Sequence, residues 1–189
     1  MAGGQSAVSF LTSAVEFEAY RIQLKSVPCP HCHAVGYLIR HGYLYGYNDG
    51  KPEKEVRGWR IFCSNRYRRN GCGHTHSILQ SQWIRHRCVK ANRLWNLLKA
   101  ILGGLSVHAA WQKARGRISI KCGYRLWKAF LSSQSAIRTL LCRKNQPKPL
   151  SEQKPCLQTI VHLRDTFISS ECPISAFQEY FQRGFLQFG

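Results

Sequence analysis

The sequence predicts an α+β fold in which a small β-sheet region is followed by a helical bundle and a helical tail. Four cysteines gather between residues 29 and 72, around stretches where apolar and polar residues alternate as in strands. Between residues 94 and 130 apolar residues recur every three or four positions, as on one face of a helix. Several prolines then precede an amphipathic tail. We therefore expect four segments, at residues 1–28, 29–82, 83–145 and 146–189.

Composition restricts the class of protein. The 189 residues carry a formal net charge of +19, and 44% of them are hydrophobic. The hydrophobic content allows a real core, whereas the charge favours a polyanionic partner that neutralises it. No apolar run approaches the ~20 residues that span a bilayer, and the first residues lack the features of a signal peptide. We expect a cytoplasmic, nucleoid-associated protein that binds nucleic acid and no membrane.

The first segment contains one local pattern. From Val15 to Ala19 apolar and polar residues alternate, which predicts a short strand.

The cysteine cluster has the spacing of metal ligands. Cys29 and Cys32 are separated by two residues, Cys63 follows after thirty, and Cys72 after eight more. Four thiolates arranged as two pairs complete a tetrahedral Zn(Cys)₄ site. We predict one structural zinc ion on these residues, with His74 or His76 as an alternative to one cysteine. The less favoured interpretation is that the four are ordinary reduced thiols.

The residues between the cysteine pairs predict a β-hairpin. Apolar and aromatic residues recur at odd positions from Tyr37 to Tyr45, with a possible break in phase at His41-Gly42. Residues 48–50 provide a turn, Val56 to Cys63 return as a strand, and Thr75 to Leu79 add a third. The result is the layout of a zinc ribbon.

The zinc ion is expected to be structural because a catalytic ion needs an open coordination position and a nearby general base. No Asp or Glu lies between Glu55 and Glu152. We therefore expect no enzymatic activity, and a small metal-dependent nuclease is the less favoured alternative.

Three helices are predicted after the ribbon. The first carries its leucines up to Leu102 and ends at Gly103-Gly104, the second is short and capped by Ser106, and the third runs from Ile120 to about Phe130. A helix, a short helix, a turn and a basic helix form a helix-turn-helix pattern. The residues that would reach DNA from the third helix are Lys121, Tyr124, Arg125 and Lys128. The alternative is a three-helix bundle with a solvated basic face.

These motifs resemble the N-terminal region of bacterial insertion-element transposases and related mobile-element proteins. The resemblance rests on Cys29-Pro-His-Cys32, on Arg57-Gly-Trp-Arg60-Ile-Phe-Cys63 and on the Gly-Cys-Gly-His-Thr run at 71–75. It extends through the helix-turn-helix pattern to about residue 145. It implies DNA binding but not strand transfer, because the residues after 145 are too few for the catalytic domain of those enzymes.

The expected function is therefore sequence-specific binding of double-stranded DNA, as an accessory factor or regulator that works with a separate recombinase or transposase. The side chains expected to hold phosphates are Arg57, Arg60, Arg66, Arg68, Arg69, Arg85, Arg87 and Lys90. A second hypothesis is RNA binding, with unpaired bases stacked on Tyr43, Tyr45, Trp59 and Tyr67. The amphipathic tail is expected either to pack on the helices or to bind a partner, for example a second copy of the chain.

Overall fold

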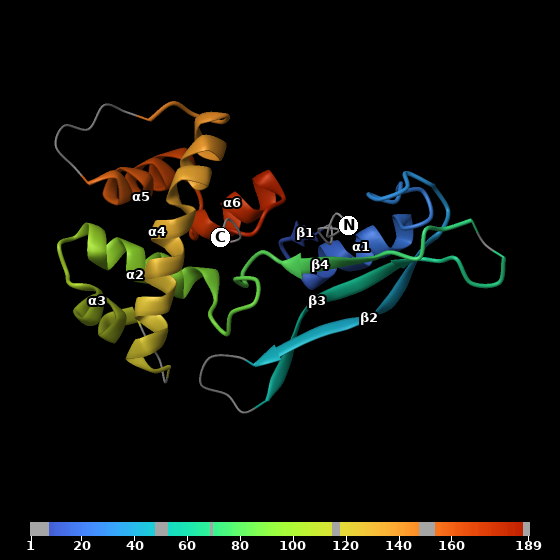
Figure 1. The fold of residues 1–189 in the computed structure, drawn as a ribbon, viewed down its shortest axis with the longest axis horizontal. Coiled ribbons are helices and arrows are strands. Elements are labelled where there is room, and N and C mark those ends of the chain that lie inside the picture. Colours follow the sequence, from blue (N-terminus) through green and yellow to red (C-terminus); the bar gives the residue numbers. More distant parts are fainter. Residues whose placement is uncertain (1–7, 48–52, 69, 115–117, 148–153, 187–189) are drawn as a thin grey trace.

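A four-stranded sheet and six helices make up the part of the chain that the computed structural model describes, which is residues 8–47, 53–68, 70–114, 118–147 and 154–186. Most helices gather at one end of the molecule and the sheet lies at the other (Figure 1). The predicted mixed α+β class is confirmed. None of the described helices is both long and apolar enough to cross a membrane.

The sheet has the order β1-β4-β3-β2. Its strands are β1 (Val8–Leu11), β2 (Leu38–Tyr47), β3 (Lys54–Cys63) and β4 (Thr75–Gln80). The predicted β2–β3 hairpin and the third strand β4 are confirmed, and the register shifts between Arg40 and Gly42, where the break in phase was expected. The predicted turn at residues 48–50 lies outside the described residues. Strand β1, which pairs in parallel with β4, was not predicted.

The strand predicted at Val15 to Ala19 is wrong, because these residues belong to helix α1 (Ala14–Gln23). The side chain of Ser13 accepts a hydrogen bond from the backbone N–H of Glu16, and the Glu16 carboxylate accepts one from the backbone N–H of Thr12. This reciprocal capping starts a helix and overrides a short alternation of polarity. Helix α1 covers one face of the sheet, where Phe17 stacks on Trp59 with ring centroids 3.8 Å apart.

The three helices expected after the ribbon are present as α2 (Ala91–Leu102), α3 (Val107–Ala114) and α4 (Ile120–Cys142). The expected end of α4 near Phe130 is wrong by three turns. The polar run after Phe130 does not stop the helix, because the Ser132 and Thr139 hydroxyls donate to carbonyls four residues earlier. The buried positions Ser133 and Ile137 continue the apolar stripe.

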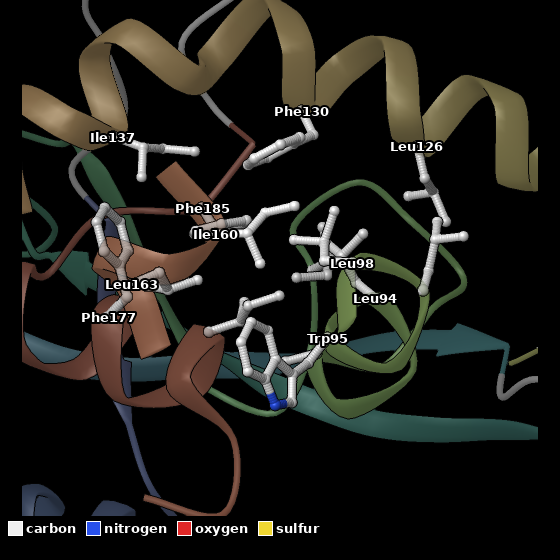
Figure 2. Close-up of a cluster of buried hydrophobic side chains, with 14 of the residues drawn as sticks. Leu94, Trp95, Leu98, Leu126, Phe130, Ile137, Ile160, Leu163, Phe177 and Phe185 are labelled. Atoms are coloured by element: carbon white, nitrogen blue, oxygen red, sulfur yellow. The ribbon is translucent and has the colours of Figure 1, made fainter. Parts of the chain in front are cut away.

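The tail forms α5 (Pro155–Thr166) and α6 (Pro173–Phe181), which fold back on the other helices. Figure 2 shows Ile160, Leu163, Phe177 and Phe185 of the tail among the buried side chains of α2 and α4. The apolar stripes of the tail are therefore used inside this chain. Binding of a second copy through the tail stays a prediction.

Helix α6 also joins the helices to the sheet (Figure 1). The Gln182 carboxamide accepts from the backbone N–H of Phe10 at 2.8 Å and donates to the carbonyl of Phe10 at 3.0 Å, so it occupies the free edge of β1. The buried Gln178 side chain donates to the carbonyls of Ser81 and Trp83, in the connection between β4 and α2. Residues 83–90, which begin the predicted helical segment, are therefore not helical, and α6 holds the start of this connection.

Candidate metal centre and basic surfaces

The four predicted cysteines converge at one end of the sheet, where β3 ends. Their sulfur atoms all lie within 4.8 Å of one another. The sulfurs of Cys29 and Cys72 are 3.7 Å apart, and those of Cys32 and Cys63 are 3.8 Å apart. A tetrahedral ion with metal–sulfur bonds of ~2.3 Å needs sulfurs ~3.8 Å apart. The spacing fits a single tetrahedral metal ion held by four thiolates.

The first cysteine pair lies in a tight turn that follows α1. The backbone N–H of Cys29 donates to the carbonyl of Ala34, and the N–H of His33 donates to the carbonyl of Cys29. His33 adopts a φ of 58°, which closes the turn. The N–H of His31 points at the Cys29 sulfur, 3.4 Å away. This contact and the turn together fix the position of the Cys29 sulfur.

The second pair is formed by a long loop that returns to its start. Cys63 ends β3, and the N–H of Cys72 lies 3.4 Å from its sulfur. The N–H of Gly73 donates to the carbonyl of Cys63. A Cβ on Gly71 would lie 2.2 Å from the carbonyl oxygen of Ser64, so only glycine fits this close approach. The eight residues between Cys63 and Cys72 therefore do not keep the two sulfur atoms apart in space.

His76 lies beside the cluster on β4. Its Nε2 is 3.4 Å from the sulfur of Cys29, and its side chain is only 5% exposed. Burial, with the nearby charges of His31 and His74, lowers the pKa of His76 to about 4. A neutral imidazole can donate from Nε2 to a thiolate, as the outer-sphere partners of metal ligands do. Within the described residues the structure thus favours four cysteine ligands, with His76 supporting them.

The thiols differ in their electrostatics. The backbone N–H of Ala34 is the main cause that lowers the pKa of Cys32 to about 7. Burial raises the pKa of Cys63 to about 12. A metal ion must therefore displace a proton from Cys63, so that binding at neutral pH is coupled to proton release.

The predicted recognition residues share one exposed face of α4. Lys121, Tyr124, Arg125 and Lys128 are all exposed. The opposite face is buried through Gly123, Leu126 and Phe130. Arg87, from the connection between β4 and α2, and Arg125 both act electrostatically on the thiol of Cys122. Burial raises the pKa of that thiol, and the charges of Arg87 and Arg125 both lower it.

Arg57 has a structural position. Its guanidinium lies over the Trp83 ring, with Cζ 4.1 Å from the centroid, and donates to the carbonyls of Arg87 and Tyr47. The buried Nε of Arg57 has no hydrogen-bond partner. Arg57 thus ties the 83–88 connection to the β2–β3 hairpin, and its contact with a phosphate stays a prediction.

A groove of about 320 Å³ lies where this connection crosses the sheet. Its basic lining residues are Arg57, Arg60, Arg85 and His86, and no carboxylate of the described residues lines it. Positive charges that converge without a carboxylate favour an anion in the groove. Both Arg60 and Arg85 line this groove, and their contact with a phosphate stays a prediction.

The remaining predicted phosphate contacts are spread out. Arg66 and Arg68 are exposed in the loop between the second pair of cysteines, where Arg66 lies over Phe62. Arg69 lies outside the described residues. Lys90 lies over the Trp83 ring at the start of α2, with Nζ 5.1 Å from the centroid.

The aromatic residues considered for base stacking separate into two groups. Trp59 is 3% exposed beneath α1 and cannot reach a base. Tyr43 and Tyr45 are exposed on β2, and so is Tyr47, which the sequence argument did not include. Tyr47 follows Tyr45 by two residues, so it faces the same side of the strand, and this spacing could have predicted its exposure.

Comparison of the chain with protein-family models, with curated proteins and with solved structures finds no match.

Proposed function

We propose that this chain is a zinc-containing protein that binds duplex DNA sequence-specifically, without catalysing a reaction. The observation that carries the proposal is the first half of α4. One side of it is packed against the bundle, and the other presents Lys121, Tyr124, Arg125 and Lys128 to solvent. The face is free of carboxylates, since no acidic residue lies between Glu55 and Glu152. Such a helix suits a major groove, where long basic side chains contact base edges and phosphates.

The packing of α3 on α4 supports a helix-turn-helix role. Ser106 caps α3 by accepting from the N–H of Ala109, and the indole N–H of Trp111 donates to the carbonyl of Ser119 just before α4. These contacts hold the start of α4 against α3. A recognition helix needs such a rigid support, because side chains must meet base edges within a fraction of an ångström.

Zinc is the proposed metal of the four-cysteine cluster. A closed set of four thiolates is typical of structural zinc, and it leaves no coordination position for a substrate. Residues that would hold the ion are Cys29, Cys32, Cys63 and Cys72, and the ion would fix the turn after α1 to the end of β3. A role beside a separate recombinase, or as a regulator of a mobile element, rests only on the resemblance of the motifs.

The proposal predicts that Arg125 reads a base. An arginine that bridges two acceptors on guanine contributes ~1–3 kcal/mol of discrimination. After a preferred duplex is selected from a random library, Arg125→Ala should lower affinity for that duplex by about five- to a hundredfold more than for a scrambled duplex.

Arg68→Ala is the matched control, because Arg68 is an exposed arginine on the other part of the molecule. It should lower both affinities equally and reduce the slope of log affinity against log salt by about 0.9. An unchanged ratio of the two affinities in Arg125→Ala would show that α4 is not the recognition element.

A further inference from the structure

Three tyrosines form an exposed row along β2. The rings of Tyr43, Tyr45 and Tyr47 are 44%, 60% and 50% exposed. They occupy alternate positions of a strand that forms one edge of the sheet, and alternate positions face the same side. The ring centroids of Tyr43 and Tyr45 are 6.0 Å apart. We call these three residues the tyrosine strip.

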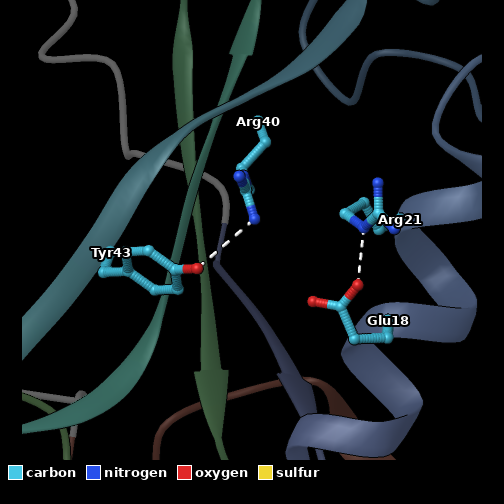
Figure 3. Close-up of polar contacts among 4 residues, drawn as sticks. All are labelled: Glu18, Arg21, Arg40 and Tyr43. Atoms are coloured by element: carbon cyan, nitrogen blue, oxygen red, sulfur yellow. Dashed lines mark hydrogen bonds and ion pairs between the residues drawn. The ribbon is translucent and has the colours of Figure 1, made fainter.

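A cation lies at each end of the strip. Arg40 reaches over Tyr43, with Cζ 5.5 Å from the ring centroid and a hydrogen bond to the hydroxyl (Figure 3). Lys54 lies over Tyr47, with Nζ 5.4 Å from the centroid. Both cations are exposed, so each can move from a ring to a phosphate. The nearby carboxylate in Figure 3, that of Glu18, is already paired with Arg21 at 2.6 Å.

The tyrosine strip is not part of the hydrophobic core of the sheet. That core lies under α1, where Phe17 and Trp59 stack, and its members are fully buried. Aromatic rings that stay half exposed match the surfaces on which proteins stack unpaired bases, when the cations beside them make no ion pair within the described residues. A nucleotide offers the flat face of its base to the ring and its phosphate to the cation. An apolar peptide would leave both cations without partners.

We propose that the tyrosine strip binds unpaired bases of single-stranded DNA. Bases in a duplex stack on one another at ~3.4 Å per nucleotide of each strand and offer no face to a ring. The 6.0 Å between the first two rings therefore requires a strand whose bases are unstacked. The strip would hold a strand where the duplex is open, while α4 holds the paired part. The proposal depends on the proposed function only for the choice of DNA over RNA.

The test measures binding of labelled oligothymidine, oligouridine and a closed hairpin duplex to the full chain. Tyr45→Thr removes a ring but keeps a residue that favours strands. It should weaken oligothymidine binding by about five- to a hundredfold and leave hairpin binding unchanged. Tyr45→Phe keeps the ring and should keep the affinity. Thermal unfolding of each variant checks that the sheet is intact.

Tyr180→Ala is the matched control, because Tyr180 is 56% exposed and lies under Lys144, but on α6. It should leave oligothymidine binding unchanged. An equal loss in Tyr45→Phe, or an equal loss for the hairpin, would overturn the stacking role. A loss confined to oligouridine would overturn the assignment to DNA. Arg125→Ala should lower hairpin binding alone, so failure of the duplex proposal is visible separately.

Discussion

At the scale of single residues, the metal centre depends on two buried cysteines and one buried histidine. Cys29 and Cys63 belong to the hydrophobic core under α1, together with Trp59 and Ile61. The ion would therefore be bound at the border of that core, and its loss would expose apolar side chains as well as thiols. The Nε2 of His76, on the neighbouring strand, lies 3.4 Å from the Cys29 sulfur.

We predict a graded loss of metal in two variants. Cys63→Ser removes a ligand, so the purified protein should hold much less than one zinc per chain and its sheet should unfold at lower temperature. His76→Gln removes only the supporting donor, and it should weaken metal affinity by ~10–100-fold. Elemental analysis and titration with a chelator measure both effects.

Cys142→Ser serves as the control for this series, because Cys142 is a half-buried cysteine on α4, outside the cluster. It should retain full zinc content. Wild-type protein that contains no metal, with four freely reactive thiols at the cluster, would refute the metal centre.

At the scale of elements, α3 and α4 cross at a glycine. A Cβ on Gly123 would lie 2.4 Å from Cγ and 2.8 Å from Cβ of Trp111, which is fully buried. The Trp111 ring is fixed by the bond from its indole N–H to the carbonyl of Ser119. The ring therefore cannot turn away from an added methyl group.

Gly123→Ala should destabilise the protein, although alanine favours helices over glycine by about 1 kcal/mol. Overpacking typically costs ~1–3 kcal/mol, and here the contact is near the backbone of a fixed ring. Urea unfolding should show a lower midpoint. The comparison is Gly103→Ala at the end of α2, where an added Cβ has its nearest neighbours at 3.5 Å and should be tolerated. A midpoint for Gly123→Ala at or above that of wild type would contradict the close crossing.

The sequence predicted those elements whose signals are local. Thiolates two residues apart reveal a metal turn, and leucines with helical spacing reveal α2, because the chemistry and the period lie within a few residues. It failed at α1, where five alternating residues were weighted above the capping pair of Ser13 and Glu16. The hydrogen bonds of Gln178 and Gln182 could not be predicted, because the local sequence around a polar residue does not indicate which distant residue it will contact.

At the scale of the whole molecule, α6 connects the two ends of the structure. The Gln178 side chain donates to the Ser81 carbonyl at 2.6 Å and to the Trp83 carbonyl at 3.1 Å, and accepts from the N–H of Phe185 at 3.1 Å. The Gln178 amide is buried, and together with the bonds of Gln182 to Phe10 it joins the helices to the sheet. The metal centre and the basic face of α4 thereby keep a defined relation to each other.

Gln178→Ala should cost about 3 kcal/mol or more, because each buried polar group left without a partner costs ~1–3 kcal/mol. Unfolding of the sheet is measured by metal release, and unfolding of the helices by circular dichroism. In this variant the two transitions should occur at different temperatures. Gln146→Ala, at an exposed position after α4, should change neither transition. Coincident transitions in Gln178→Ala at wild-type stability would mean that α6 is not the connection.

The bonds between Gln182 and Phe10 span 172 residues, and this has a consequence for synthesis on the ribosome. The amino-terminal part of a chain folds first, so the sheet can assemble while α6 is still inside the exit tunnel. Until α6 emerges, the outer side of β1 has unpaired backbone groups, which invite another nascent chain to pair there. A ribosome that stalls before α6 would therefore release a product prone to aggregation, whereas completing the last helix closes that edge.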